Sequence, residues 1–169
     1  QKLMDQAGKG EKLADWDWWY YTEKLRKEKY DLEEDQIKPY FKLENVREGA
    51  FAVANKLYGI TLTKLNDVPV YHPDVEVFEV KDADGSQLGI FYVDYFPRAG
   101  KSGGAWLSNY REQKGDIRPL VCNVASFTKP VGDTPSLLTI DEVETLFHEF
   151  GHALHGLLTK CNYLGVSGT

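Results

Sequence analysis

The strongest constraint on the fold is the segment from residue 139 to residue 158, which carries the start signal and the periodicity of an amphipathic helix. Thr139 stands before it and Glu142 follows three residues later, so the two can form a capping box. An apolar stripe then recurs at helical spacing: Ile140, Val143, Phe147, Phe150, Leu154 and Leu157. An apolar stripe is stable only when it is buried, so we expect this helix to form one side of a core.

Helical patterns also occupy the first part of the chain. We expect a helix over residues 16–29 and another over residues 43–58, the second ended by Gly59. Between them, Asp31 and Glu34 resemble a further capping box.

The middle of the chain has the composition of strands. Three apolar runs predict strands, at residues 75–80, 87–96 and 120–127. The Asp84-Gly85 pair between the first two is typical of a hairpin turn. The Gly-rich segment 99–104 lacks the spacing of a phosphate-binding loop, and we interpret it as a mobile flap near a cleft.

This order of patterns indicates an α+β fold within one domain. We expect a helical part over residues 1–65, a small sheet over residues 66–130, and the last helix with the end of the chain over residues 131–169. The first residues contain neither an initiator Met nor an apolar signal region, so the beginning reads as cut rather than native.

Charge and hydropathy exclude several classes of partner. A net charge of −6 argues against nucleic acid, and no apolar stretch approaches the roughly 20 residues that span a bilayer. Cys122 and Cys161 lack metal-ligand spacing, and we expect them to be small buried hydrophobes. Together with the missing signal region, this cysteine usage favours a bacterial cytoplasmic location.

The chemistry of the chain is concentrated in "HEFGH", residues 148–152, an H-E-x-x-H motif within the last helix. His148 and His152 are four residues apart, so they lie on one helix face about 6 Å apart along the axis. Both imidazoles can therefore bind one zinc ion at about 2.0–2.1 Å. Glu149 lies beside that position, where its carboxylate can act as the general base for a water of lowered pKa. Gly151 leaves room for a close approach to the helix. Histidines that merely satisfy hydrogen bonds would need no particular spacing.

The other candidate ligands do not complete this site. His155 is about 10.5 Å from His148 along the axis, so we interpret it as an outer-shell residue or one satisfied within the core. Glu144 lies about 12 Å from His152 along the helix. No Asp or Glu follows His152, so we expect the third metal ligand beyond residue 169. The chain then reads as a fragment that binds zinc weakly or not at all and is inactive by itself.

Two other readings stay open. Glu149 and His152 also have the Glu-x-x-His spacing of carboxylate-bridged di-metal proteins, although the sequence contains no second such motif. The chain could instead be a non-catalytic module that binds peptides or serves as a scaffold.

Four stretches of the sequence strongly resemble the M3 family of zinc oligopeptidases: "VCNVASFTKP", "IFYVDYFPRAGKSGGAW", "ADWDWWYYTEKLRKEKYDLEEDQIKPYF" and "SLLTIDEVETLFHEFGHALHGLL". The stretch "IFYVDYFPRAGKSGGAW" looks closest to the peptidyl-dipeptidase branch of that family. The resemblance implies a mostly helical, two-lobed, zincin-type metallopeptidase with one zinc ion, which cleaves short peptides and removes C-terminal dipeptides. It implies His148 and His152 as zinc ligands, Glu149 as the catalytic acid/base, and a downstream Glu as the third ligand.

The substrate-binding residues are not assigned by the sequence. The strand around residues 123–127 precedes the motif helix and could pair with a bound peptide as an exposed edge. It could equally be an interior strand with both edges paired.

Overall fold

The computed structural model describes residues 12–30 and 34–168, and the chain divides after Pro39 into two units. Among the described residues, no helix is long and apolar enough to cross a membrane.

The first unit is helical. A short 3-10 turn, η1 (Asp15–Asp17), leads into α2 (Trp18–Tyr30), and α3 (Glu34–Ile37) and η2 (Lys38–Tyr40) follow. The helix expected over residues 16–29 is therefore confirmed, with a start two residues later. The expected capping box includes Asp31, which lies outside the described residues.

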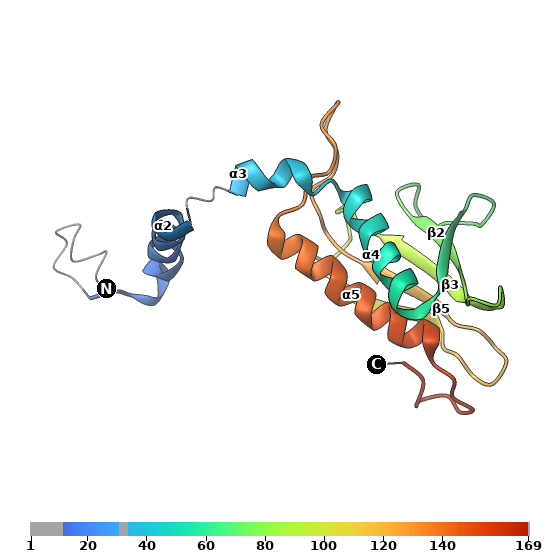
Figure 1. The fold of residues 1–169 in the computed structure, drawn as a ribbon. Helices are drawn as coiled ribbons and strands as arrows, with labels where there is room; N and C mark the ends of the chain where they lie inside the picture. The colour runs from blue at the N-terminus through green and yellow to red at the C-terminus, as the bar shows by residue number, and fades with distance from the viewer. Residues whose placement is uncertain (1–11, 31–33, 169) are drawn as a thin grey trace. The chain divides into compact units, whose positions relative to one another are not determined.

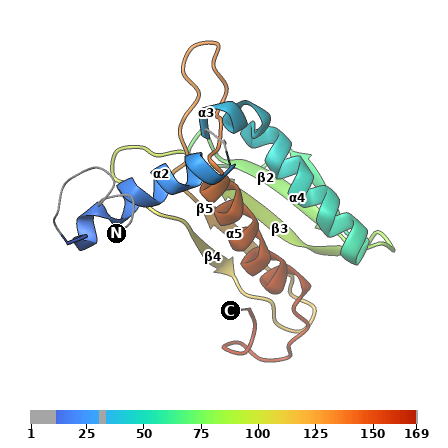
Figure 2. The same cartoon turned by 60° about the vertical axis from the view of Figure 1, so that its left-hand side comes forward.

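The second unit is a five-stranded mixed sheet with two helices on one face (Figures 1 and 2). The helices are α4 (Leu43–Tyr58) and α5 (Ile140–Leu158). The strands are β1 (Thr61–Leu65), β2 (Glu76–Lys81), β3 (Gln87–Asp94), β4 (Trp106–Arg111) and β5 (Leu120–Val124), in the spatial order β1-β2-β3-β5-β4. The α+β prediction is confirmed at this level.

Three strands and their hairpin agree with the sequence, and two strands were missed. β2 and β3 form the predicted antiparallel hairpin, and Gly85 adopts a φ of 85° in its turn. β1 and β4 are short, half-exposed and partly polar, so they lack a clear strand signal. Residues 61–65, expected at the end of the helical part, therefore belong to the sheet.

β5 is an interior strand. It pairs in parallel with β3 on one side and antiparallel with β4 on the other. Beyond Val124 the chain still bonds to the β3 segment, because the Ala125 N–H donates to the Asp94 carbonyl at 2.8 Å and the Phe127 N–H to Tyr95 at 2.9 Å. Of the two readings left open for residues 123–127, the interior strand is therefore the one that β5 shows through Val124, where both sides are paired. The edge strand on this side of the described sheet is β4.

The core lies between the two helices and the sheet. The ring of Phe51 on α4 packs against Phe78, Phe91 and Phe150, with centroids 5.1, 6.4 and 5.5 Å away. The Phe91 and Phe150 rings are 5.6 Å apart, so one aromatic cluster joins α4, α5 and β3.

The buried face of α5 is rotated from the predicted stripe. Ile140 and Phe147 are 38% and 40% exposed, whereas Leu146 and Ala153, which the stripe omitted, are buried at 2% and 0%. The row that faces the core is Leu146, Phe150, Ala153 and Leu157. The helix packs on the sheet along this row, and its Phe147 side therefore turns outward.

A buried charge cluster anchors the Gly-rich segment before β4. The Lys101 ammonium donates to the Asp94 carboxylate at 3.0 Å and to the carbonyls of Asp94, Phe96 and Ala125 at 2.8, 2.7 and 2.5 Å. Arg98 adds a two-pronged contact to the same carboxylate at 2.7 and 2.8 Å. The expectation of a mobile flap over residues 99–104 is wrong at Lys101, which is held by these acceptors.

Stability should depend on the charge of Asp94. Burial alone would raise the pKa of this carboxyl, but hydrogen bonds from Arg98, Lys101 and Tyr71 outweigh it and lower the pKa from 3.8 to about 2. A pKa that is lower in the folded state gives stability above the unfolded value, and this stability, about 2 kcal/mol, is lost as the pH falls from about 4 toward 2. Urea unfolding across this range should show the loss.

Asp94→Asn should abolish that pH dependence and destabilise the protein by about 3–5 kcal/mol at pH 7, because Lys101 would stay buried without its counter-ion. Asp74→Asn is the matched control, since the pair of Asp74 with Lys129 is partly exposed and should be worth less than about 1 kcal/mol. Equal losses in the free energy of unfolding from the two substitutions would contradict the role of Asp94 as the buried counter-ion of Lys101.

A second prediction concerns the close approach of α5 to β3. A Cβ on Gly89 would lie 2.8 Å from the Leu157 Cδ2 and 2.8 Å from the carbonyl oxygen of Pro119. Gly89→Ala should therefore lower the free energy of unfolding by about 1–3 kcal/mol. Gly151→Ala, on the open side of α5 with nothing within 4 Å, should instead raise it by about 0.5–1 kcal/mol through helix propensity. Thermal or urea unfolding of the two variants measures whether the free energy of unfolding falls for Gly89→Ala and rises for Gly151→Ala.

Candidate metal and active site

The helix that carries the motif is fixed at both ends. At its start the Glu142 N–H donates to the Thr139 Oγ1 at 3.1 Å, and the Thr139 N–H donates to the Glu142 Oε2 at 2.9 Å, which confirms the predicted capping box. At its end the Arg118 guanidinium donates to the carbonyls of Leu157 and Leu88, each at 2.7 Å. Arg118 thereby joins the last turn of α5 to the start of β3.

The structure brings His148 and His152 together. Their Nε2 atoms are 3.1 Å apart, and the rings meet edge to face with an interplanar angle of 85°. Two nitrogens that each lie about 2.0–2.1 Å from one zinc ion can be at most about 4.2 Å apart, so this separation fits two ligands of one ion. It also fits a single N–H···N hydrogen bond between the rings, for which one Nε2 must carry the proton.

His152 lies one turn from the residue of α5 that approaches β4 and β5 most closely in the glycine contacts. A Cβ on Gly156 would lie 3.4 Å from the Val121 side chain of β5 and 3.6 Å from the Asn109 Oδ1 of β4. His152 precedes Gly156 by four residues and therefore shares its side of the helix.

Glu149, which stands between the two histidines in the sequence, is half-buried. His152 is also half-buried, whereas His148 is exposed. A Cβ on Gly151 would meet nothing within 4 Å, so the helix surface next to His152 is open. A carboxylate, two imidazoles and an accessible helix surface are the groups that proton transfer to and from a water requires.

His155 lies apart from this group. It is exposed, so the expectation that the core satisfies it is wrong, while an outer-shell role stays a prediction. With its neighbours it lines an open hollow of about 450 Å³ between α4 and α5, formed by Tyr58, Gly151, Leu154, His155, Leu158 and Thr159.

The donor set is incomplete among the described residues. Within residues 12–30 and 34–168, no group of three or more His, Cys, Asp or Glu side chains lies close enough to hold a metal ion. Glu144 is exposed on α5. Cys122 is buried as expected, and burial raises the pKa of its thiol, whereas Cys161 is only half-buried.

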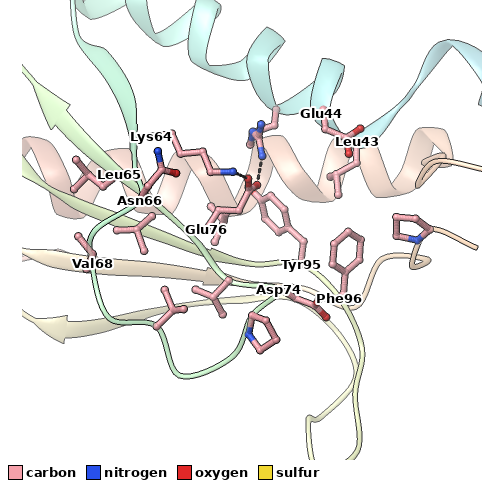
Figure 3. A pocket seen from close by; sticks show the side chains of 17 residues that line it. Leu43, Glu44, Lys64, Leu65, Asn66, Val68, Asp74, Glu76, Tyr95 and Phe96 are labelled. Carbon is pink, nitrogen blue, oxygen red and sulfur yellow. Dashed lines mark hydrogen bonds and ion pairs between the residues drawn. The ribbon is translucent and has the colours of Figure 1, made fainter.

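Another hollow, of about 440 Å³, lies elsewhere in this unit (Figure 3). The Glu76 carboxylate stands at its wall, paired with Arg47 from α4 and Lys64 from β1. None of the motif residues lines it. We therefore do not assign the chemistry of the motif to this hollow.

Two residues to which the sequence assigned no role become noticeable in the structure, Arg118 through its bonds to α5 and β3 and Asn123 through its burial. Arg118 stands in a loop with no motif, and Asn123 stands within the apolar run "LVCNVASF". A polar residue inside an apolar run that predicts a strand was the available signal for Asn123.

Comparison with known proteins agrees with the motif. The model of peptidase family M3 matches residues 1–169. Dipeptidyl carboxypeptidase of Salmonella typhimurium is 49% identical over all of this chain, and that of Escherichia coli is 48% identical. Oligopeptidase A of Escherichia coli is 41% identical over 94% of the chain.

The chain covers 25%, 25% and 24% of these three relatives, about a quarter of their length. The match to the family nevertheless extends over the whole chain, and its relatives are far above 30% identity. The chain belongs to peptidase family M3.

Proposed function

We propose that this protein is a zinc metallopeptidase that hydrolyses short peptides. The observation that carries the proposal is the 3.1 Å separation of the His148 and His152 Nε2 atoms, next to Glu149 on one helix of an M3-family chain. The imidazole nitrogens suit zinc in type and separation.

His148 and His152 would hold the ion through Nε2, and Glu149 would carry out the proton transfers. When bound, zinc would supply Lewis-acid chemistry and lower the pKa of a water toward about 7. The Glu149 carboxylate takes a proton from the attacking water and gives it to the amine of the leaving peptide. Hydrogen bonds at both ends of α5 fix the helix, so the three side chains keep their positions relative to one another.

Zinc needs a third protein ligand, and we place it outside the described residues. Two imidazoles leave a four-coordinate shell incomplete, so this chain by itself should bind zinc weakly and show little activity. The di-metal reading needs a second carboxylate–histidine motif, and metal analysis separates the possibilities by finding one zinc, two metals or none. A cytoplasmic location also stays a prediction.

For the substrate, we propose peptides that pair with the free edge of β4 and lose a C-terminal dipeptide. Edge strands bind extended peptides through main-chain hydrogen bonds. β4 has one sheet neighbour among the described residues, and α5 lies against both β4 and β5. Release of dipeptides is suggested by the relatives named dipeptidyl carboxypeptidase, which match over the whole chain.

The first test is Glu149→Gln in the whole protein that carries this chain. Because the amide cannot accept the proton of the attacking water, turnover of a short peptide should fall by at least about 10²–10⁴-fold, while bound zinc stays at one per protein. His148→Ala and His152→Ala should instead remove the zinc. Metal analysis and peptide hydrolysis are measured on the same samples.

Glu144→Gln is the matched control, because Glu144 is exposed on the same helix and should leave both measurements unchanged. Undiminished hydrolysis by the Glu149 variant would remove the proposed mechanism.

The second test concerns the peptide edge. In the Glu149→Gln protein, a bound peptide should slow amide hydrogen exchange in β4, residues 106–111, because new main-chain bonds would form there. β1, residues 61–65, is the other edge of the same sheet and serves as the internal control. If the peptide slows amide hydrogen exchange in β1 but not in β4, the proposal that peptides pair with the edge of β4 is wrong.

A further inference from the structure

β4 carries a bulge at Tyr110. Asn109 pairs with Val121 of β5. The next paired residue of β4 is Arg111, and its partner is Leu120. Two steps along β4 therefore correspond to one step along β5, so Tyr110 is the extra residue. A bulge bends and twists its strand, which disrupts the regular spacing of the main-chain groups at that point.

The bulge limits what the edge of β4 can bind. β5 is the one neighbour of β4 among the described strands, so the opposite edge of β4 is the one that a peptide could join. A ladder needs residues that follow one another at regular spacing. Residues 106–109 pair with β5 without interruption and meet this requirement, whereas a ladder must end at Tyr110. A peptide on this edge therefore leaves the sheet at the bulge.

A hollow of about 530 Å³ lies at the same place. Its lining is formed by residues 109–112, Lys114, Ile117 and Leu164. Asn109 approaches α5, whereas the ring of Tyr110 packs on Tyr92 with centroids 5.6 Å apart. Tyr92 follows Phe91, which packs on α5, so Tyr92 and Tyr110 stand on the other face of the sheet. A hollow that touches residues from both faces of β4 lies beyond the border of that strand, and β5 occupies the opposite border.

The hollow exposes large apolar side chains. Tyr110, Ile117 and Leu164 are each more than half exposed. They come from β4, from its connection to β5 and from the segment after α5. Exposed apolar side chains that gather in one concavity from separate segments indicate a binding site for an apolar group. The charged side chains of the lining carry both signs, so the hollow does not present a single kind of charge. They are Arg111, Glu112 and Lys114.

Hydrogen bonds fix the walls of the hollow before any peptide binds. The buried Gln113 amide donates through Nε2 to the Gly115 carbonyl and accepts through Oε1 from the Cys161 N–H, each at 2.7 Å. The Gly115 N–H donates to the Cys161 carbonyl at 2.9 Å. These bonds join the segment that carries Leu164 to the connection that carries Ile117. Less conformational freedom is lost when a ligand enters a preformed hollow, which favours affinity.

We propose that this hollow is a specificity pocket, which holds one apolar side chain of a peptide whose main chain pairs with residues 106–109 of β4. The inference rests on the proposed function and adds the class of side chain that the substrate presents. A peptide on an edge strand gains affinity from main-chain hydrogen bonds, and pockets beside the strand select its side chains. The bulge at Tyr110 ends the ladder beside the hollow, so the side chain that follows the ladder can enter it.

Hydrolysis of a peptide series by the whole protein that carries this chain tests the proposal. In each member of the series, one Leu of the peptide is replaced by Ser. At one position this change should lower kcat/KM at least about tenfold, because the apolar pocket loses its occupant. The double substitution Ile117→Ser with Leu164→Ser should reduce that preference to within about twofold and leave the other positions unchanged. Because both side chains are exposed, the urea unfolding midpoint should stay that of wild type.

Val166→Ser is the matched control. Val166 lies in the same segment as Leu164 and is also more than half exposed, but it does not line the hollow. This substitution should leave every preference as in wild type. Leu164→Lys is a second variant of the pocket. It should raise kcat/KM for a peptide with Glu at the selected position relative to the peptide with Leu, because an ammonium then faces that side chain.

A wild type that accepts Leu and Ser equally at every position would overturn the inference, and so would a preference that the double substitution leaves unchanged. An equal effect of Val166→Ser would also overturn it, because the preference would not depend on the hollow. These outcomes leave the proposed function intact, since the wild type still hydrolyses the peptides. If the whole protein holds zinc but hydrolyses none of the peptides, the proposed function fails, and this inference fails with it.

Discussion

The contact of α5 with the sheet is the interaction on which the rest of the second unit depends. Phe150 packs on Phe91 and Phe51, and the missing side chain of Gly89 lets Leu157 approach β3. Arg118 then fixes the end of the helix to the same strand through two carbonyls. A helix held this way cannot rotate, so His148 and His152 keep their positions relative to the sheet. Hydrophobic packing thus determines where the polar groups of the motif are presented.

The Asp94 cluster adds a second constraint on the same geometry. Asp94 ends β3, and Lys101 lies in the segment that leads to β4, so their ion pair fixes the path of the chain between these strands. The carbonyl of Ala125, just after β5, is a further acceptor of Lys101. One buried ammonium therefore joins the ends of two neighbouring strands to the entry of the edge strand. Both the apolar and the charged contacts serve to place β4 beside α5.

Local signals in the sequence predicted much of this architecture. The Thr139–Glu142 box, the Gly59 stop and the Asp84-Gly85 turn are each decided by a few adjacent residues, and all three occur in the structure. The sequence could not show the rotation of α5, because Phe147 and Leu146 are equally apolar and only the sheet distinguishes them. The position of β5 inside the sheet was also invisible, since it depends on β4, whose half-exposed residues give little strand signal. For the candidate site, the spacing of the motif predicted the convergence of two imidazoles, while the amide of Asn123 became noticeable only through its burial.

The strand order has a consequence for how the protein emerges during synthesis. β4 leaves the ribosome before β5, yet β5 is its one neighbour among the described strands. A nascent chain that ends after β4 therefore lacks the strand with which β4 pairs in the folded protein. The later strand must insert between two earlier ones, a non-local step of the kind that slows folding. The edge next to the motif helix thus forms only when the motif helix itself is about to be made, so the nascent chain does not present that edge while its chemistry is still missing.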